Sequence, residues 1–194
     1  MTRANKNNII TLPHKSLRTK SQKVGIITDE IKNLILDMES ATLDWEDSRE
    51  HEVGVALAAV QINKLYRVVV VRNNFDDKND RTFITLINPT ITKYEGTVEE
   101  DFEGCLSIKD TYGKVPRHNK VRVKALNSEG KEIRVTAEGF LARVLQHEID
   151  HTNGIVFIDH IKDNPKAFLR LAQDGKLQNL DYESVIKNNK ELWD

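Results

Sequence analysis

One stretch of the chain decides its fold and its chemistry: FLARVLQHEIDHTNG, residues 140–154. Its apolar residues recur at helical spacing, and Asn153-Gly154 supplies a helix stop. His147 and His151 stand four residues apart, so on a helix with 3.6 residues per turn they lie about 40° apart around the axis. Both imidazoles can therefore reach one metal ion, and Glu148 lies beside them, near a water molecule at that ion. For this pattern alone, an exposed helix with two ordinary histidines is the alternative.

A catalytic metal site needs a third protein ligand and an open position. No further histidine or glutamate follows His151 at the spacing of zinc peptidases, because the next histidine is His160. The lone cysteine, Cys105, is the better candidate, and it lies in the segment Glu103-Gly104-Cys105-Leu106-Ser107. A thiolate is favoured beside a divalent cation. Inert packing in the core is the commonest behaviour of a single cysteine and stays the alternative.

A third segment, Gly54 to Gln61, is rich in small residues. Small residues allow a backbone to approach a ligand or another chain closely. Gln61 ends the segment with a side chain that can donate hydrogen bonds. Tight packing is the more common explanation of such a stretch.

The remaining patterns predict a helix followed by strands. Thr28 is a capping hydroxyl before Asp29-Glu30, and helical periodicity then runs until it fades near residues 45–48. Strands are expected at the following segments: Val68–Val71, Thr82–Ile87 closed by Asn88-Pro89, residues 121–125, and residues 132–136 after a turn at residues 127–130.

After the helix that carries the two histidines, a last helical segment is expected from Pro165 to about Ala172. The tail after about residue 175 is weakly patterned, with a short helix expected near residues 184–192. The fold class is therefore α+β, with antiparallel β-sheet and a central helix. The length of 194 residues suits a single catalytic domain, 1–194.

The composition limits the function classes. Hydrophobic residues make up 39% and charged residues 30%, and the net charge is -1, so no direct nucleic-acid site is expected. One cysteine excludes a disulfide scaffold and fits a reducing compartment. No apolar run is long enough for a membrane span. The first acidic residue is Asp29, and an acid-poor start also occurs in organelle transit peptides. A solvated N-terminus, and hence a cytoplasmic protein rather than one of an organelle matrix, is the preferred interpretation.

Taken together, the three segments resemble the peptide deformylase family. That family carries a Gly-rich motif ending in Ala-Ala-x-Gln, then Glu-Gly-Cys-Leu-Ser, then His-Glu-x-x-His with Asp before the second His, and this chain has all three in order. Val115-Pro116-Arg117 and the segment from Pro13 to Arg18 also match. The resemblance covers roughly Leu12 to Asp159. Ala56 stands where the family usually has a second glycine.

The resemblance implies a peptide-deformylase-like fold, in which antiparallel β-sheets pack around a central metal-binding helix. It also implies the reaction: metal-dependent hydrolysis that removes the formyl group from the N-terminal formylmethionine of new polypeptides and releases formate. Cys105, His147 and His151 would hold one divalent metal, typically Fe(II), with Zn, Ni or Co as substitutes. Glu148 would act as the base. Gln61 and the backbone N–H of Leu106 would stabilise the oxyanion.

Further roles follow from the resemblance. Gly54, Val55, Ala56, Phe140 and Val144 would bind the substrate peptide, with core packing as the alternative for the apolar side chains. Glu103 would hold a ligand histidine in place, with a solvated acid as the alternative. The expected partners are nascent formylmethionyl peptides, and contact with the ribosome is left open. A zinc peptidase and a metal-bound, non-catalytic binding module of the same fold are the rival interpretations.

Overall fold

The computed structural model describes residues 2–49, 52–172 and 176–193. The helices are α1 (Asp29–Asp47), α2 (Gly139–Thr152) and α3 (Lys190–Trp193). The strands are β1 (Ala56–Ala58), β2 (Val68–Arg72), β3 (Phe83–Cys105), β4 (Ile108–Leu126), β5 (Glu132–Glu138), β6 (Phe168–Leu171) and β7 (Leu177–Asn179). Short 3-10 turns lie at Lys6–Asn8, Lys15–Arg18, Ala59–Ile62, Phe157–His160 and Pro165–Ala167, and a π-helical turn lies at Tyr182–Ile186.

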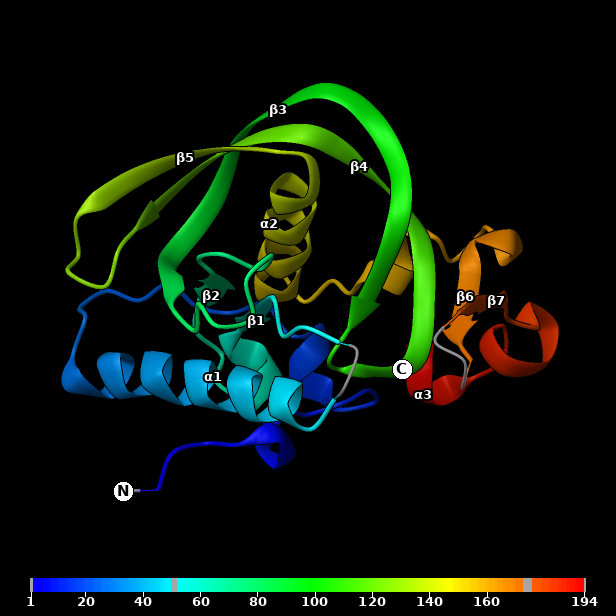
Figure 1. Cartoon of the computed structure of the whole chain (residues 1–194), viewed down its shortest axis with the longest axis horizontal. Coiled ribbons are helices and arrows are strands. Elements are labelled where there is room, and N and C mark those ends of the chain that lie inside the picture. The colour runs from blue at the N-terminus through cyan, green and yellow to red at the C-terminus, as the bar shows by residue number, and fades with distance from the viewer. Residues whose placement is uncertain (1, 50–51, 173–175, 194) are drawn as a thin grey trace.

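The strands form one antiparallel sheet in the order β1-β2-β3-β4-β6-β7, and β5 pairs with β4 beside this path. The long strands β3 and β4 change register at several points, and such bulges bend a sheet. Figure 1 shows the result: β3 and β4 arch over α2, while α1 crosses below β1 and β2. The central helix is thus enclosed by the sheet, as the fold class predicts. No helix in the described part of the chain combines the length and apolar character that crossing a bilayer requires.

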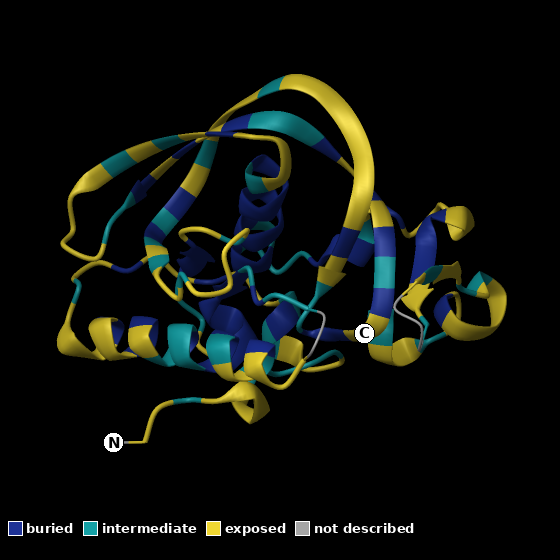
Figure 2. Ribbon diagram, viewed as in Figure 1, coloured by how far each residue is buried: buried dark blue, intermediate teal, exposed yellow. Residues whose placement is uncertain are grey.

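The short strands β1 and β2 carry core side chains on both faces. Alternate residues such as Ala58 and Val69 pack in one cluster with α2, whereas Leu57 and Val70 pack in a second cluster with α1. Since side chains alternate between the faces of a strand, a strand covered on both sides is apolar throughout. This explains the uninterrupted valine run. Figure 2 shows α2 buried for most of its length, whereas the crest of β3 is exposed.

A buried ion pair joins α1 to the sheet. Glu46 Oε2 lies 2.9 Å from the Arg72 guanidinium, and both side chains are almost fully buried. The same carboxylate oxygen accepts a hydrogen bond from the N–H of Gly54 at 3.0 Å. The N–H of Arg72 donates to the carbonyl of Val55 at 2.7 Å. These bonds fix the segment that leads into β1.

Several expectations from the sequence are confirmed. The helix predicted after Thr28, the strand at Val68–Val71, the return strand after the turn and the histidine-bearing helix all form. Thr28 occupies the N-cap of α1, but its hydroxyl makes no capping hydrogen bond, so the first-turn acids Asp29 and Glu30 supply the favourable charge.

One predicted strand end and one predicted helix are wrong. The strand expected to close at Asn88-Pro89 instead continues as β3 to Cys105, because Pro89 lies in a bulge where no ladder bond is lost. Asn88 stabilises this bulge, since its side chain bonds the backbone N–H and carbonyl of Val24. The helix expected over Pro165 to Ala172 is a 3-10 turn followed by strand β6, which pairs with β4. The tail has a π-helical turn and α3 near the helix expected there, preceded by strand β7.

Replacing Glu46 by Ala should lower the free energy of unfolding by about 3–5 kcal/mol, because the buried Arg72 loses its partner. Asp47→Ala is the matched control, since Asp47 pairs with Arg81 at 2.8 Å but the two side chains are 56% and 44% exposed. That change should cost at most about 1 kcal/mol. Urea unfolding of both variants checks this. Equal losses would contradict the structural importance of the buried pair.

Candidate metal centre

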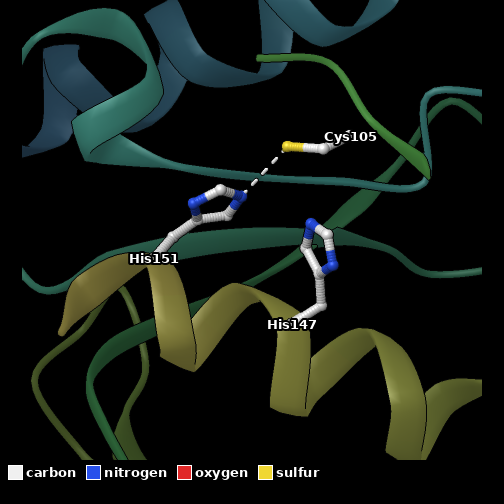
Figure 3. Close-up of side chains that lie close together, drawn as sticks. All are labelled: Cys105, His147 and His151. Atoms are coloured by element: carbon white, nitrogen blue, oxygen red, sulfur yellow. Dashed lines mark hydrogen bonds between the residues drawn. The ribbon is translucent and has the colours of Figure 1, made fainter. Parts of the chain in front are cut away.

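Three ligand-type side chains converge between α2 and the end of β3. Cys105, His147 and His151 each offer a ligand atom, and these atoms all lie within 4.8 Å of one another. The Cys105 Sγ lies 3.2 Å from His151 Nε2 (Figure 3). His147 and His151 project from α2 with ring centroids 4.9 Å apart. Two histidines four residues apart on α2 thus present their rings to one point, and the Sγ of Cys105 lies beside them.

The cysteine is positioned by the turn between β3 and β4. Cys105 pairs with Ile108, so Leu106 and Ser107 form the link between the two strands. The N–H of Ser107 donates to the Cys105 Sγ at 3.5 Å. Gly104 leaves room for the ring of Tyr112, because a Cβ there would come within 2.6 Å of that ring. The glycine thus allows the strand to bring its cysteine to the helix.

His147 is oriented by a buried carboxylate. Its Nδ1 lies 2.9 Å from Glu103 Oε2. Burial alone would raise the pKa of Glu103, but His147 and Arg117 outweigh it and hold that pKa below its usual range. An ionised carboxylate only accepts hydrogen bonds, so the Nδ1 of His147 carries the proton and its Nε2 faces the other ligands. This is the arrangement expected of a ligand histidine.

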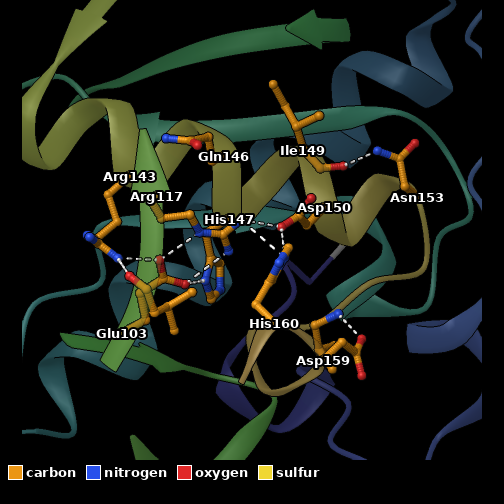
Figure 4. A network of polar contacts seen from close by, with 12 residues as sticks. Glu103, Arg117, Arg143, Gln146, His147, Ile149, Asp150, Asn153, Asp159 and His160 are labelled. Atoms are coloured by element: carbon orange, nitrogen blue, oxygen red, sulfur yellow. Dashed lines mark hydrogen bonds and ion pairs between the residues drawn. The ribbon is translucent and has the colours of Figure 1, made fainter. Parts of the chain in front are cut away.

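Two arginines share Glu103 with the histidine, as Figure 4 shows. Arg117 donates two hydrogen bonds to the carboxylate, at 2.9 and 3.1 Å, and Arg143 donates one at 2.9 Å. Arg117 also bonds Asp150, whose carboxylate lies 2.7 Å from His160 Nε2. Asp150 therefore acts on His147 through Arg117 and Glu103.

Sequence reasoning missed the contribution of Arg143 and His160. A signal existed for Arg143, since it precedes His147 by four residues and so shares its helix face. For His160 the sequence offers no local signal, because its partner Asp150 lies on another element.

Glu148 is buried without a full set of partners. The side chain is nearly inaccessible, and its Oε2 has no hydrogen-bond partner among the described residues. Burial raises the pKa of this carboxyl to about 7. Such a group can take up or release a proton near neutral pH. It lines the same cavity as Cys105 and His147.

The donor set fits a divalent metal ion. Burial lowers the pKa of His151, so its ring is neutral and keeps a lone pair for a ligand bond. Burial also disfavours charge on His147, but the Cys105 thiol and Glu103 outweigh burial and raise that pKa. A cation bound by the three residues would displace the extra proton. One thiolate and two imidazoles suit several transition metals.

The side chain of Gln61 lies beside Cys105 and Ser107. Its Nε2 is 3.6 Å from the Cys105 Sγ and 3.2 Å from the Ser107 hydroxyl. Its Oε1 accepts the N–H of Ala58 at 2.8 Å, which leaves the amide donor turned toward the site. Leu106, the residue after the cysteine, lines the same cavity.

A cavity of about 660 Å³ opens beside these residues. The predicted substrate-binding residues Val55, Ala56, Phe140 and Val144 line it. Phe140 is 48% exposed and meets Phe75 edge-on, with ring centroids 5.1 Å apart. Gly54 lies outside the lining. Its backbone packs against Thr42, where a Cβ would approach within 2.8 Å.

Comparison with known proteins agrees with this geometry. The family model described as polypeptide deformylase matches residues 6–167. A peptide deformylase of Thermomicrobium roseum is 42% identical over 169 residues, which are 86% of this chain and 90% of that protein. One of Brachyspira hyodysenteriae is 42% identical over 180 residues, which are 91% of each protein.

Solved structures of the same kind resemble the fold. A peptide deformylase from Legionella pneumophila matches with a TM-score of 0.71 and 38% identity, covering 81% of this chain and 85% of that one. A peptide deformylase from Synechococcus elongatus, solved in complex with actinonin, matches with a TM-score of 0.69 and 33% identity, covering 78% and 76%. The match spans most of the sequence and the whole candidate metal centre. This chain therefore belongs to the peptide deformylase family, metal-dependent hydrolases that remove the formyl group from the N-terminus of newly made polypeptides.

Proposed function

We propose that this chain releases formate from nascent formylmethionyl polypeptides with one divalent cation held by Cys105, His147 and His151. One observation carries the proposal: three ligand atoms within 4.8 Å of one another lie beside the buried carboxyl of Glu148, whose Oε2 has no hydrogen-bond partner among the described residues. A purely structural metal site needs no such acid and no cavity. A non-catalytic module of the same fold would release no formate.

The chemistry divides between the cation and the protein. A cation at these ligands supplies a positive charge that polarises the formyl carbonyl and favours ionisation of water. Glu148 takes the proton from the attacking water and later delivers it to the leaving amine nitrogen. A carboxyl whose pKa lies at about 7 suits both directions of transfer, although a nearby cation would lower that pKa.

Charge that develops on the formyl oxygen is stabilised by donors of this chain. The Gln61 amide points toward the cysteine, and Leu106 offers its backbone N–H at the turn beside it. Removing one donor of this kind typically costs roughly 100-fold to 1,000-fold in turnover. Because Ala58 holds the Gln61 oxygen, the amide is oriented before substrate arrives.

The methionine side chain binds against Val55, Phe140 and Val144, beside Ala56. The peptide backbone pairs with the segment that leads into β1, which is an edge of the described sheet. Gly54 contributes through its bond to Glu46, which fixes that segment. Main-chain pairing tolerates any downstream sequence, as an enzyme acting on many nascent chains requires.

The chain acts as one catalytic unit over residues 1–194, of which residues 1, 50–51, 173–175 and 194 lie outside the described residues. Fe(II) is the proposed physiological metal. Relatives from bacteria and the free Cys105 support a reducing, cytoplasmic location.

Glu148→Gln should keep about one metal ion per chain and lose turnover on formyl-Met-Ala-Ser by roughly 100-fold to 10,000-fold, because the proton acceptor is gone. Formate release and metal analysis on the same anaerobic preparation check this. Glu100→Gln is the control, because Glu100 is exposed. Full turnover in Glu148→Gln would remove Glu148 from the mechanism, and no formate from the metal-loaded native protein would reject the function.

Glu103→Gln should weaken metal binding by roughly 10-fold to 100-fold, because the amide holds His147 less firmly than the ionised carboxylate does. Competition with a chelator of known affinity measures the change, with Glu100→Gln again as the control. Near-ultraviolet circular dichroism of the metal-loaded variant shows whether the fold persists. Unchanged affinity in a folded variant would reject the positioning role.

The iron-loaded protein should lose activity in air faster than the nickel-loaded protein, because iron reacts with oxygen beside the Cys105 thiolate. Timed formate assays on the two forms, each kept in air and under argon, measure the decay. Equal decay rates in air would argue against iron as the ion on which the chain depends in the cell.

A further inference from the structure

We propose that the hairpin of β6 and β7 forms a subsite that selects an apolar side chain downstream of the formylmethionine. This inference rests on the proposed function and adds a substrate preference to it. The residues concerned are Leu171, Ala172 and Leu177, which line the cavity that also contains Cys105 and Glu148.

The hairpin pairs with β4, the strand that follows the turn at Leu106 and Ser107. Leu169 of β6 pairs with Tyr112 of β4, and Phe168 pairs with Gly113. Phe168 is fully buried and anchors the hairpin. Gly113 permits close packing at this point, since a Cβ there would lie 2.4 Å from Ile161. The hairpin is therefore held at a fixed distance from the metal centre.

The face that the hairpin turns to the cavity is apolar. Leu171 and Leu177 are cross-strand partners, so their side chains lie next to each other on one face. Leu171, at the end of β6, is 36% exposed, whereas Phe168 at the start of the same strand is buried. Ile108, at the start of β4, lines the cavity with them. The exposed Leu171 and the half-buried Leu177 form a surface in the cavity that an apolar side chain of the substrate would cover.

The charged residues near the hairpin in the cavity lining balance one another. Glu52 accepts a hydrogen bond from the Tyr112 hydroxyl at 2.8 Å and pairs with Arg49 at 2.9 Å. The Arg49 guanidinium also lies 4.9 Å from the centre of the Trp45 ring. The charges of Glu52 and Arg49 are therefore satisfied by each other. Lys109 and Asp110, which also line the cavity, are opposite in sign.

The hairpin lies just beyond the residues that the family model matches, because that match ends at residue 167 and β6 begins at Phe168. The backbone contacts near β1 tolerate any side chain, so a preference has to come from side-chain pockets. The hairpin provides such a pocket beyond the methionine site, within reach of the second or third residue of an extended peptide.

The test compares formyl-Met-Leu-Ser and formyl-Met-Ala-Leu with formyl-Met-Ala-Ser. The native protein should favour one leucine peptide over formyl-Met-Ala-Ser by about tenfold in kcat/KM, and Leu171→Ser/Leu177→Ser should reduce that ratio to about one. Leu36→Ser is the matched control, because Leu36 is 44% exposed on α1 and lies outside the cavity lining. It should keep the native preference.

Calorimetric binding of the same peptides to metal-loaded Glu148→Gln, with and without the two serine substitutions, separates this inference from the function. A leucine preference in binding that disappears with the serines supports the subsite even where no formate forms. Equal binding of the three peptides, or a preference that survives both serines, would overturn it.

Discussion

The carboxylate of Glu103 is a negative charge in the interior of the protein, and the metal centre depends on it. Taking an isolated carboxylate out of water is costly, and here Arg117, Arg143 and His147 offset the cost. The same bonds join β3, β4 and α2. The group that orients His147 thus also holds the arch of the sheet against the helix, so the fold and the site share one interaction.

This coupling explains why α2 is buried almost all around although it carries charged residues. Arg143, His147 and Glu148 are all buried on the helix that the arch of β3 and β4 encloses. Arg143 and His147 contact Glu103, and Glu148 lines the cavity. A helix on the surface would leave these groups in water, where burial would not shift the pKa of Glu148. Burial of α2 under the sheet is therefore what raises the pKa of Glu148.

The sequence predicts the parts of this arrangement that depend on local spacing. The distance of four residues between His147 and His151 is a property of any helix, and the strand pattern of the valine run depends only on alternation. By contrast, β6 could not be predicted, because Phe168 to Leu171 form a strand only where the free edge of β4 accepts them. The role of Arg143 likewise depends on Glu103, which is remote in sequence. Gly54 was predicted as a substrate contact, but its fixed place depends on Glu46 and Thr42.

The position of Cys105 at the turn between β3 and β4, opposite two histidines of α2, has a consequence for the stability of the whole protein. An unfolded chain cannot hold the three donors together, so a cation at these residues would bind the folded state far more tightly than the unfolded state. By linkage, the midpoint of thermal unfolding would rise with free metal concentration, because the ion acts as a removable cross-link between sheet and helix. Depletion of metal would then abolish activity and also lower the stability of the packing between the sheet and its central helix.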